Sequence, residues 1–147
     1  MQTTSEVRPS YLYSEEPAIK NYYPKWLDNL AHDATLEGSM LDGVVQGAES
    51  VRLVVATIRS FYDRQAHRFA GHCGNGGFLE DYVAEVRGEP IGCVVLVAYN
   101  DAGEAQKVVA SYRPRTSVLH FAHLLAGKFA DTPIAKNFTE NRERRIP

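Results

Sequence analysis

Apolar residues recur at helical spacing in three segments of the chain and alternate with polar residues in six others. The helical spacing predicts helices over Ser14–Leu30, Ala48–Tyr62 and Ser117–Phe129. The alternation, bounded by turn residues, predicts strands over Ala34–Met40, Val44–Gln46, His67–Cys73, Phe78–Arg87, Ile91–Tyr99 and Glu104–Tyr112. This order of elements favours an α+β fold, in which helices pack on one face of a curved sheet.

The first expected helix carries its own start signal. Ser14 is a suitable N-cap, the two glutamates after it suit the positive end of a helix dipole, and Pro17 is tolerated in a first turn. A second proline, Pro24, is expected to kink this helix or to divide it in two.

The last four expected strands form an antiparallel meander, and two turn signals set its expected register. A two-residue turn at Asn75–Gly76 places Gly71 opposite Glu80, and one at Gly88–Glu89 places Glu80 opposite Val97. Alternation then divides the side chains between two faces. The face expected to meet the helices carries His67, Phe69, Cys73, Phe78, Glu80, Tyr82, Ala84, Val86, Cys93, Val95 and Val97. The opposite face mixes apolar and charged groups, which fits a protein interface better than plain solvent.

One member of the apolar face is a carboxylate. Glu80 stands between Phe78 and Tyr82, and ionisation of a carboxyl in such surroundings is costly, so Glu80 is a candidate acid or base. Tyr82 lies ~7 Å further along the same strand and could donate a hydrogen bond to it. The alternative is that Glu80 reaches water at a strand end or pairs with an arginine, such as Arg113 or Arg115.

Composition bounds the class of protein. The chain has 147 residues, of which 44% are hydrophobic and 23% charged, with a formal net charge of -2. These values predict one domain over residues 1–147. The even charge balance gives no basic field for nucleic acid. No apolar run approaches the ~20 residues of a membrane span, and the polar N-terminus favours a cytoplasmic protein.

Cysteine and histidine positions predict neither a disulfide nor a metal site. The expected register places Cys73 and Cys93 ~20 Å apart, so both should be free thiols in a reducing compartment. His120 and His123 are three residues apart, a usable ligand spacing, but no third ligand is evident. No phosphate-binding loop occurs either, and we expect no cofactor.

The segment His32–Gly38, followed by Gly47 and the helix start Ala48–Val51, resembles the nuclear transport factor 2-like superfamily. That group includes ketosteroid isomerase, limonene epoxide hydrolase, scytalone dehydratase and the polyketide-cyclase-like proteins. Together with the order of elements, the resemblance covers roughly Ser14–Arg113, which implies a core at about 14–113 and a C-terminal helix and tail at 114–147. It implies a cone-shaped antiparallel sheet wrapped around the N-terminal and central helices, an apolar pocket inside and, in many members, a homodimer through the outer sheet face.

Ketosteroid isomerase is the nearest motif match, yet its chemistry does not carry over. The resemblance places Gly38 where that enzyme has its aspartate base, and Val95 where its second acid donates to the oxyanion. Tyr22 or Tyr23 could stand in for the tyrosine of its first helix. Without the base and the donor, steroid isomerisation is not expected. The sequence offers no Arg/Asp pair that matches the epoxide hydrolase site and no securely placed pair of histidines for the dehydratase site.

The sequence therefore predicts a pocket of small-molecule size with Glu80 as the proton-transfer group and Tyr82 holding or polarising a substrate oxygen. The residues expected to bind an apolar substrate are Trp26, Leu36, Met40, Phe69, Phe78, Val95 and Val97. The rival hypothesis is a non-catalytic binding or assembly module, whose pocket holds an apolar ligand or is filled by its own side chains.

Overall fold

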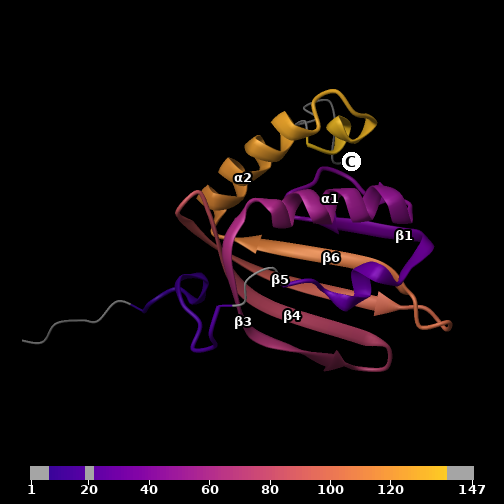
Figure 1. Cartoon of the computed structure of the whole chain (residues 1–147), viewed down its shortest axis with the longest axis horizontal. Helices are drawn as coiled ribbons and strands as arrows, with labels where there is room; N and C mark the ends of the chain where they lie inside the picture. Colours follow the sequence, from indigo (N-terminus) through magenta and orange to yellow (C-terminus); the bar gives the residue numbers. More distant parts are fainter. Residues whose placement is uncertain (1–6, 19–21, 139–147) are drawn as a thin grey trace, which may run out of the picture.

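The computed structural model describes residues 7–18 and 22–138, and Figure 1 shows a curved sheet with the helices on one side of it. The strands are β1 (Leu30–Gly38), β2 (Val45–Gln46), β3 (Tyr62–Cys73), β4 (Gly77–Val86), β5 (Glu89–Tyr99) and β6 (Ala105–Arg113). The helices are α1 (Ala48–Ser60) and α2 (Arg115–Lys128), with short 3₁₀ turns η1 (Ser10–Leu12), η2 (Lys25–Asp28) and η3 (Pro133–Asn137).

The sheet has six strands in the order β2-β1-β6-β5-β4-β3. β1 and β6 pair in parallel, and the other neighbours pair antiparallel. The sheet is not closed: among the described residues, β2 and β3 remain its two edges. These features confirm the predicted α+β class and add a parallel pairing that the sequence did not reveal.

α1 covers the concave face of the sheet. Val51, Val54, Val55 and Ile58 are buried on one side of it at helical spacing, and Figure 1 shows the helix lying along the strands. The helix ends at Ser60, two residues before its predicted end, because the chain continues directly into β3. The apolar stripe of α1 and the inward residues of the strands form one hydrophobic core.

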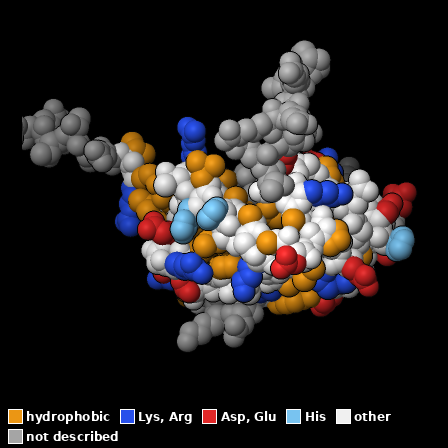
Figure 2. Space-filling view, turned by 90° about the horizontal axis from the view of Figure 1, so that it is seen from above, with side chains coloured by type: hydrophobic (Ala, Val, Ile, Leu, Met, Phe, Trp, Pro, Cys, Tyr) orange, Lys and Arg blue, Asp and Glu red, His pale blue; other side chains and the backbone are white. Residues whose placement is uncertain are grey.

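α2 lies beyond the end of α1 and is anchored by Phe121 and Leu125, both almost completely buried. Its Leu119 is 61% exposed. In the view from the helix side, apolar and histidine side chains reach the surface among basic and acidic ones (Figure 2). No helix in the described parts of the chain combines the length and apolar character needed to cross a membrane.

The predicted N-terminal helix is wrong for the described residues. Residues 14–18 form no helix, residues 19–21 lie outside the description, and only η2 makes a single 3₁₀ turn. Pro24 explains part of the difference, because it lies in the interior of the predicted helix, where it removes an N–H donor and disfavours helical backbone in the residue before it. η2 nevertheless buries Trp26 and Leu27 in the core, so the segment contributes packing without a helix.

The two turns of the meander differ from those predicted. At the β3–β4 turn Cys73 pairs with Gly77, which leaves three residues in the loop instead of two. At the β4–β5 turn Val86 pairs with Glu89, so Arg87 and Gly88 form the loop. Their φ values of 51° and 82° are both positive, as a type I′ hairpin requires, and this explains why the turn begins one residue earlier than predicted.

These shifts affect the predicted faces unequally. The β4–β5 register moves by two residues, which places Glu80 opposite Val95 instead of Val97 and keeps the same side chains inward. In β3 the longer turn and a bulge at Arg68 change the pairing partners of residues 69–73, the half of the strand next to the turn. Ala70, not Gly71, therefore pairs with Glu80. Cys73 and Cys93 are both free thiols, as predicted.

Candidate functional site

Glu80 lies in the interior, on the face predicted from alternation. Glu80 is 2% exposed, and its partners on the neighbouring strands are Ala70 in β3 and Val95 in β5. It borders a small cavity with apolar side chains of η2, α1 and the sheet, among them Trp26 and Leu36. A buried carboxyl in such surroundings requires hydrogen-bond donors.

The donor to Glu80 is Tyr22, not Tyr82 as predicted. The Tyr22 hydroxyl donates to Oε1 of Glu80, and Nε2 of His67 lies 3.8 Å from the same oxygen. The rings of Tyr22 and His67 pack edge to face with centroids 4.3 Å apart. Burial, and then the hydrogen bond to Glu80, raise the pKa of Tyr22 well above its ordinary value. Tyr22 therefore remains a neutral donor at physiological pH.

His67 adds an unpartnered polar group beside this carboxylate. It is 8% exposed, and neither of its ring nitrogens has a hydrogen-bond partner within the described residues. The sequence placed His67 on the inward face and assigned it no role. Its inward direction follows from pairing with Tyr82 before the β3 bulge.

Tyr82 belongs to a second polar cluster deeper in the fold. Its hydroxyl lies 2.7 Å from that of Tyr62, which lies 2.8 Å from the hydroxyl of Tyr112. Burial raises the pKa of all three tyrosines and raises that of the Cys93 thiol to about 12. Three hydroxyl protons serve two hydrogen bonds, so one proton of the cluster stays available to another acceptor.

The arginines near the site also differ from the prediction. Arg113 pairs with Asp81 at 3.5 Å on the outer face and donates to Ser10, so it does not pair with Glu80. Arg59 of α1 borders the cavity instead, with its guanidinium 5.2 Å from the ring centre of Tyr23. The Nε atom of Arg59 and the Nε1 atom of Trp26 are buried without hydrogen-bond partners in the described chain.

The cavity beside Glu80 is much smaller than predicted. Its volume is about 40 Å³, which holds water but not an apolar substrate. Among the predicted binding residues, Trp26, Leu36 and Val95 line it together with Glu80 and Tyr82.

The remaining predicted binding residues lie elsewhere. Met40 and Val97 are buried in the core without bordering the cavity, and Phe78 is partly buried beside that core. Phe69 does not border the Glu80 cavity: it is 50% exposed and pairs with Asp81 on the outer face after the bulge, and with His67 it lines a separate surface groove of about 410 Å³.

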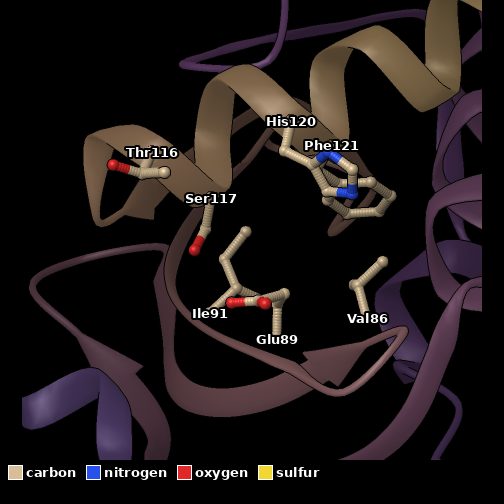
Figure 3. Close-up of a pocket in the computed structure, with 7 residues that line it drawn as sticks. All are labelled: Val86, Glu89, Ile91, Thr116, Ser117, His120 and Phe121. Carbon is tan, nitrogen blue, oxygen red and sulfur yellow. The ribbon is translucent and has the colours of Figure 1, made fainter.

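A larger cavity of about 260 Å³ lies where α2 meets the β4–β5 turn (Figure 3). Val86, Ile91 and Phe121 form its buried floor, while His120 and Glu89 belong to its exposed rim. His120 therefore lies at the rim of a cleft between α2 and the β4–β5 turn. The ring of Phe121 packs against Tyr112 with centroids 6.2 Å apart, which separates this cleft from the tyrosine cluster.

Gly38 stands at the end of β1, where the resemblance placed the isomerase base. A Cβ atom added to Gly38 would lie 1.9 Å from the carbonyl oxygen of Ala110. No side chain fits there unless β1 and β6 separate, which agrees with the rejection of steroid isomerase chemistry.

Tyr62, Tyr112 and Arg59 were missed as site residues. Tyr62 and Tyr112 lie where the sequence predicts a helix end and a strand end, so their alignment with Tyr82 depends on three separate elements. The sequence signal that could have identified the tyrosines is that large aromatic residues with hydroxyl groups occur at strand positions that point inward.

The chain matches no family profile and no curated protein sequence. Solved structures do match it. A bacterial protein with a cystatin-like fold from Silicibacter pomeroyi aligns with a TM-score of 0.67 and 16% identity, over 72% of this chain and 74% of that one. A steroid delta-isomerase from Pseudomonas aeruginosa aligns with a TM-score of 0.66 and 15% identity, over 71% of this chain and 77% of that one.

A third similar structure is an NTF-2 like protein from Burkholderia xenovorans. It aligns with a TM-score of 0.51 and 14% identity, over 61% of this chain and 73% of that one. These likenesses confirm the predicted cystatin-like, nuclear transport factor 2-like fold. At such identities they establish the fold alone.

Proposed function

We propose that this chain uses its nuclear transport factor 2-like fold for proton transfer on a small apolar substrate, with Glu80 as general acid or base. The cavity beside Glu80 has room only for water, so the proposal requires the segment that carries Tyr22 to move aside when the substrate binds. The observation that carries the proposal is a carboxylate, 2% exposed, beside a cavity that is otherwise mainly apolar. A positioned carboxyl in such a site contributes a rate factor of about 10²–10⁴. The reaction types that fit are isomerisation, epoxide opening, cyclisation and dehydration.

The tyrosine cluster supplies the complementary group. Tyr82 and Tyr112 border the same cavity as Glu80, and burial keeps their hydroxyls neutral. In a reaction that develops negative charge on a substrate oxygen, the free proton of this cluster would donate to that oxygen. Glu80 would remove the proton from carbon or from an attacking water, and would return it later in the cycle.

The test is a panel of small enones, epoxides and hydroxy ketones, with product formation followed by NMR. Glu80→Gln should lower any turnover at least about 100-fold, whereas Asp81→Asn should leave it unchanged. Asp81 is the matched control because it is the next residue of β4 and points to the outer face. Equal turnover in wild type and Glu80→Gln would overturn the proposal.

A non-catalytic binding or assembly module is the second candidate, and the small volume beside Glu80 favours it. A cavity of about 40 Å³ is close to a core filled by its own side chains. In that case the panel should show neither turnover nor binding, and Glu80→Gln should change stability only.

We also propose that the outer sheet face joins two copies of the chain. Leu96 of the interior strand β5 is 44% exposed and Phe69 of the edge strand β3 is 50% exposed, so this face presents large apolar side chains at its surface. Light scattering should give twice the chain mass, and Leu96→Asp should reduce it to that of one chain. A monomeric wild-type chain would contradict this proposal.

A further inference from the structure

We propose that the ligand of the Glu80 site is a neutral hydroxyarene, a phenol-like compound, and that Tyr22 occupies its place. The inference uses the same carboxylate as the proposed function and names the chemical class that this carboxylate recognises. Its test measures binding and requires no turnover.

Tyr22 is held as a bound phenol would be. Its hydroxyl donates to Glu80, and its ring packs against His67 at 4.3 Å between centroids. It belongs neither to a helix nor to a strand, while both of its contacts are on the sheet. The sheet therefore provides an acceptor and an aromatic wall, and an adjoining segment provides the phenol.

The charge of Glu80 selects a neutral donor at its own carboxylate, while the Arg59 guanidinium borders the cavity on the α1 side. A carboxylate ligand would bring a second negative charge to Glu80, which is unfavourable in a buried position. An O–H group satisfies Glu80 without adding charge, as Tyr22 does. Burial and Glu80 both oppose ionisation of the phenol, so a hydroxyarene would bind in its neutral form.

Exchange of Tyr22 for a ligand is feasible because the two ends of the contact differ in burial. Tyr22 is half-buried, whereas Glu80 is 2% exposed. If Tyr22 leaves, its hydroxyl reaches water, but Glu80 is left without its donor, and an unmade buried hydrogen bond is costly. A free phenol would restore the bond and refill the space of the ring beside the cavity.

The experiment compares phenol with toluene, which has nearly the same shape but no hydroxyl. Tyr22→Ala should bind phenol at least about tenfold more tightly than the wild type does and about tenfold more tightly than it binds toluene. Tyr23→Phe is the control and should behave as wild type, because it removes only the hydroxyl that bonds to exposed Asp28 and keeps the ring that Arg59 contacts. Binding is measured by calorimetry and by the rise in thermal stability.

Equal affinity of Tyr22→Ala for phenol and toluene, or no phenol binding, would overturn the inference. If Tyr22→Ala does not fold, Tyr22 resonances of the wild-type chain provide the second test. Saturating phenol should shift the Tyr22 ring signals and leave those of Tyr23 unchanged, and shifts confined to Tyr23 would contradict it. Phenol binding in Tyr22→Ala with full turnover in Glu80→Gln would reject the proposed function alone.

Discussion

The hydroxyl of Tyr22 donates a hydrogen bond to the carboxylate of Glu80 across a sequence separation of 58 residues. The contact joins a segment outside the sheet to the interior of β4. It also satisfies the carboxylate that borders the small cavity of the site.

A double-mutant cycle measures this contact. Tyr22→Phe and Glu80→Gln, alone and combined, should give a coupling free energy of about 1 kcal/mol or more, because the acceptor is a buried carboxylate. The measurement is urea unfolding of the four chains. The Tyr23–Asp28 pair, joined at 2.7 Å on the surface, serves as the control cycle and should couple less. Additive effects at Tyr22 and Glu80 would show that the contact contributes nothing.

Alkaline pH should destabilise the fold through the tyrosine cluster. Burial raises the pKa of Tyr62, Tyr82 and Tyr112 above their ordinary value of 10.0 and that of Cys93 from 9.0 to about 12. Above these ordinary values the unfolded chain loses protons that the folded chain keeps. The stabilisation is therefore complete below about pH 9 and falls as pH rises, by about 1.4 kcal/mol per pH unit for each such group.

Urea unfolding between about pH 8 and about pH 11 checks this prediction. Replacing Tyr62 and Tyr112 by Phe should flatten the decline, since two of the titrating groups are removed. A free energy of unfolding that does not change over this range would contradict the burial of the cluster.

Gly38→Ala should destabilise the chain by more than about 3 kcal/mol, because its Cβ would overlap the carbonyl of Ala110 and force β1 from β6. Gly127→Ala is the control: no atom lies within 4 Å of its added Cβ. In α2 that substitution should be neutral or stabilise by up to about 1 kcal/mol. Thermal unfolding distinguishes the two, and similar melting temperatures would refute the close approach at Gly38.

Phe121→Ala should cost about 3–5 kcal/mol, as expected for a large buried aromatic. The ring of Phe121 is 1% exposed and contacts Phe61 at 5.5 Å between centroids. Leu119→Ala, on the exposed side of the same helix, should change stability by less than about 0.5 kcal/mol. Equal losses for both variants would mean that α2 is not anchored through Phe121.

The sequence predicted those parts of the fold that depend on local periodicity. α1, β2 and β4–β6 fall close to the predicted ranges, because their apolar spacing is regular and their turns contain glycine. β1 and β3 begin four and five residues before their predicted starts, in segments whose spacing predicted helix or no regular element. The prediction for the N-terminal segment failed, since its apolar spacing is helical while Pro24 interrupts a helix in its interior.

Of the candidate site, the sequence predicted only what strand alternation determines, namely which side chains point inward. The inward position of Glu80 survived a register error of two residues, because an even shift preserves the face. An odd shift and a bulge in β3 moved Phe69 outward. The partner of Glu80 was not predictable from spacing, since Tyr22 lies in a segment without regular structure.

Deuterium exchange at carbon tests the central claim most directly. Small ketones are incubated with the chain in heavy water, and loss of the protons next to the carbonyl is followed by NMR. For a ketone that binds, the wild type and Asp81→Asn should exchange these protons at least about 100-fold faster than Glu80→Gln. Exchange at the same rate in wild type and Glu80→Gln would contradict a role for Glu80 in proton transfer.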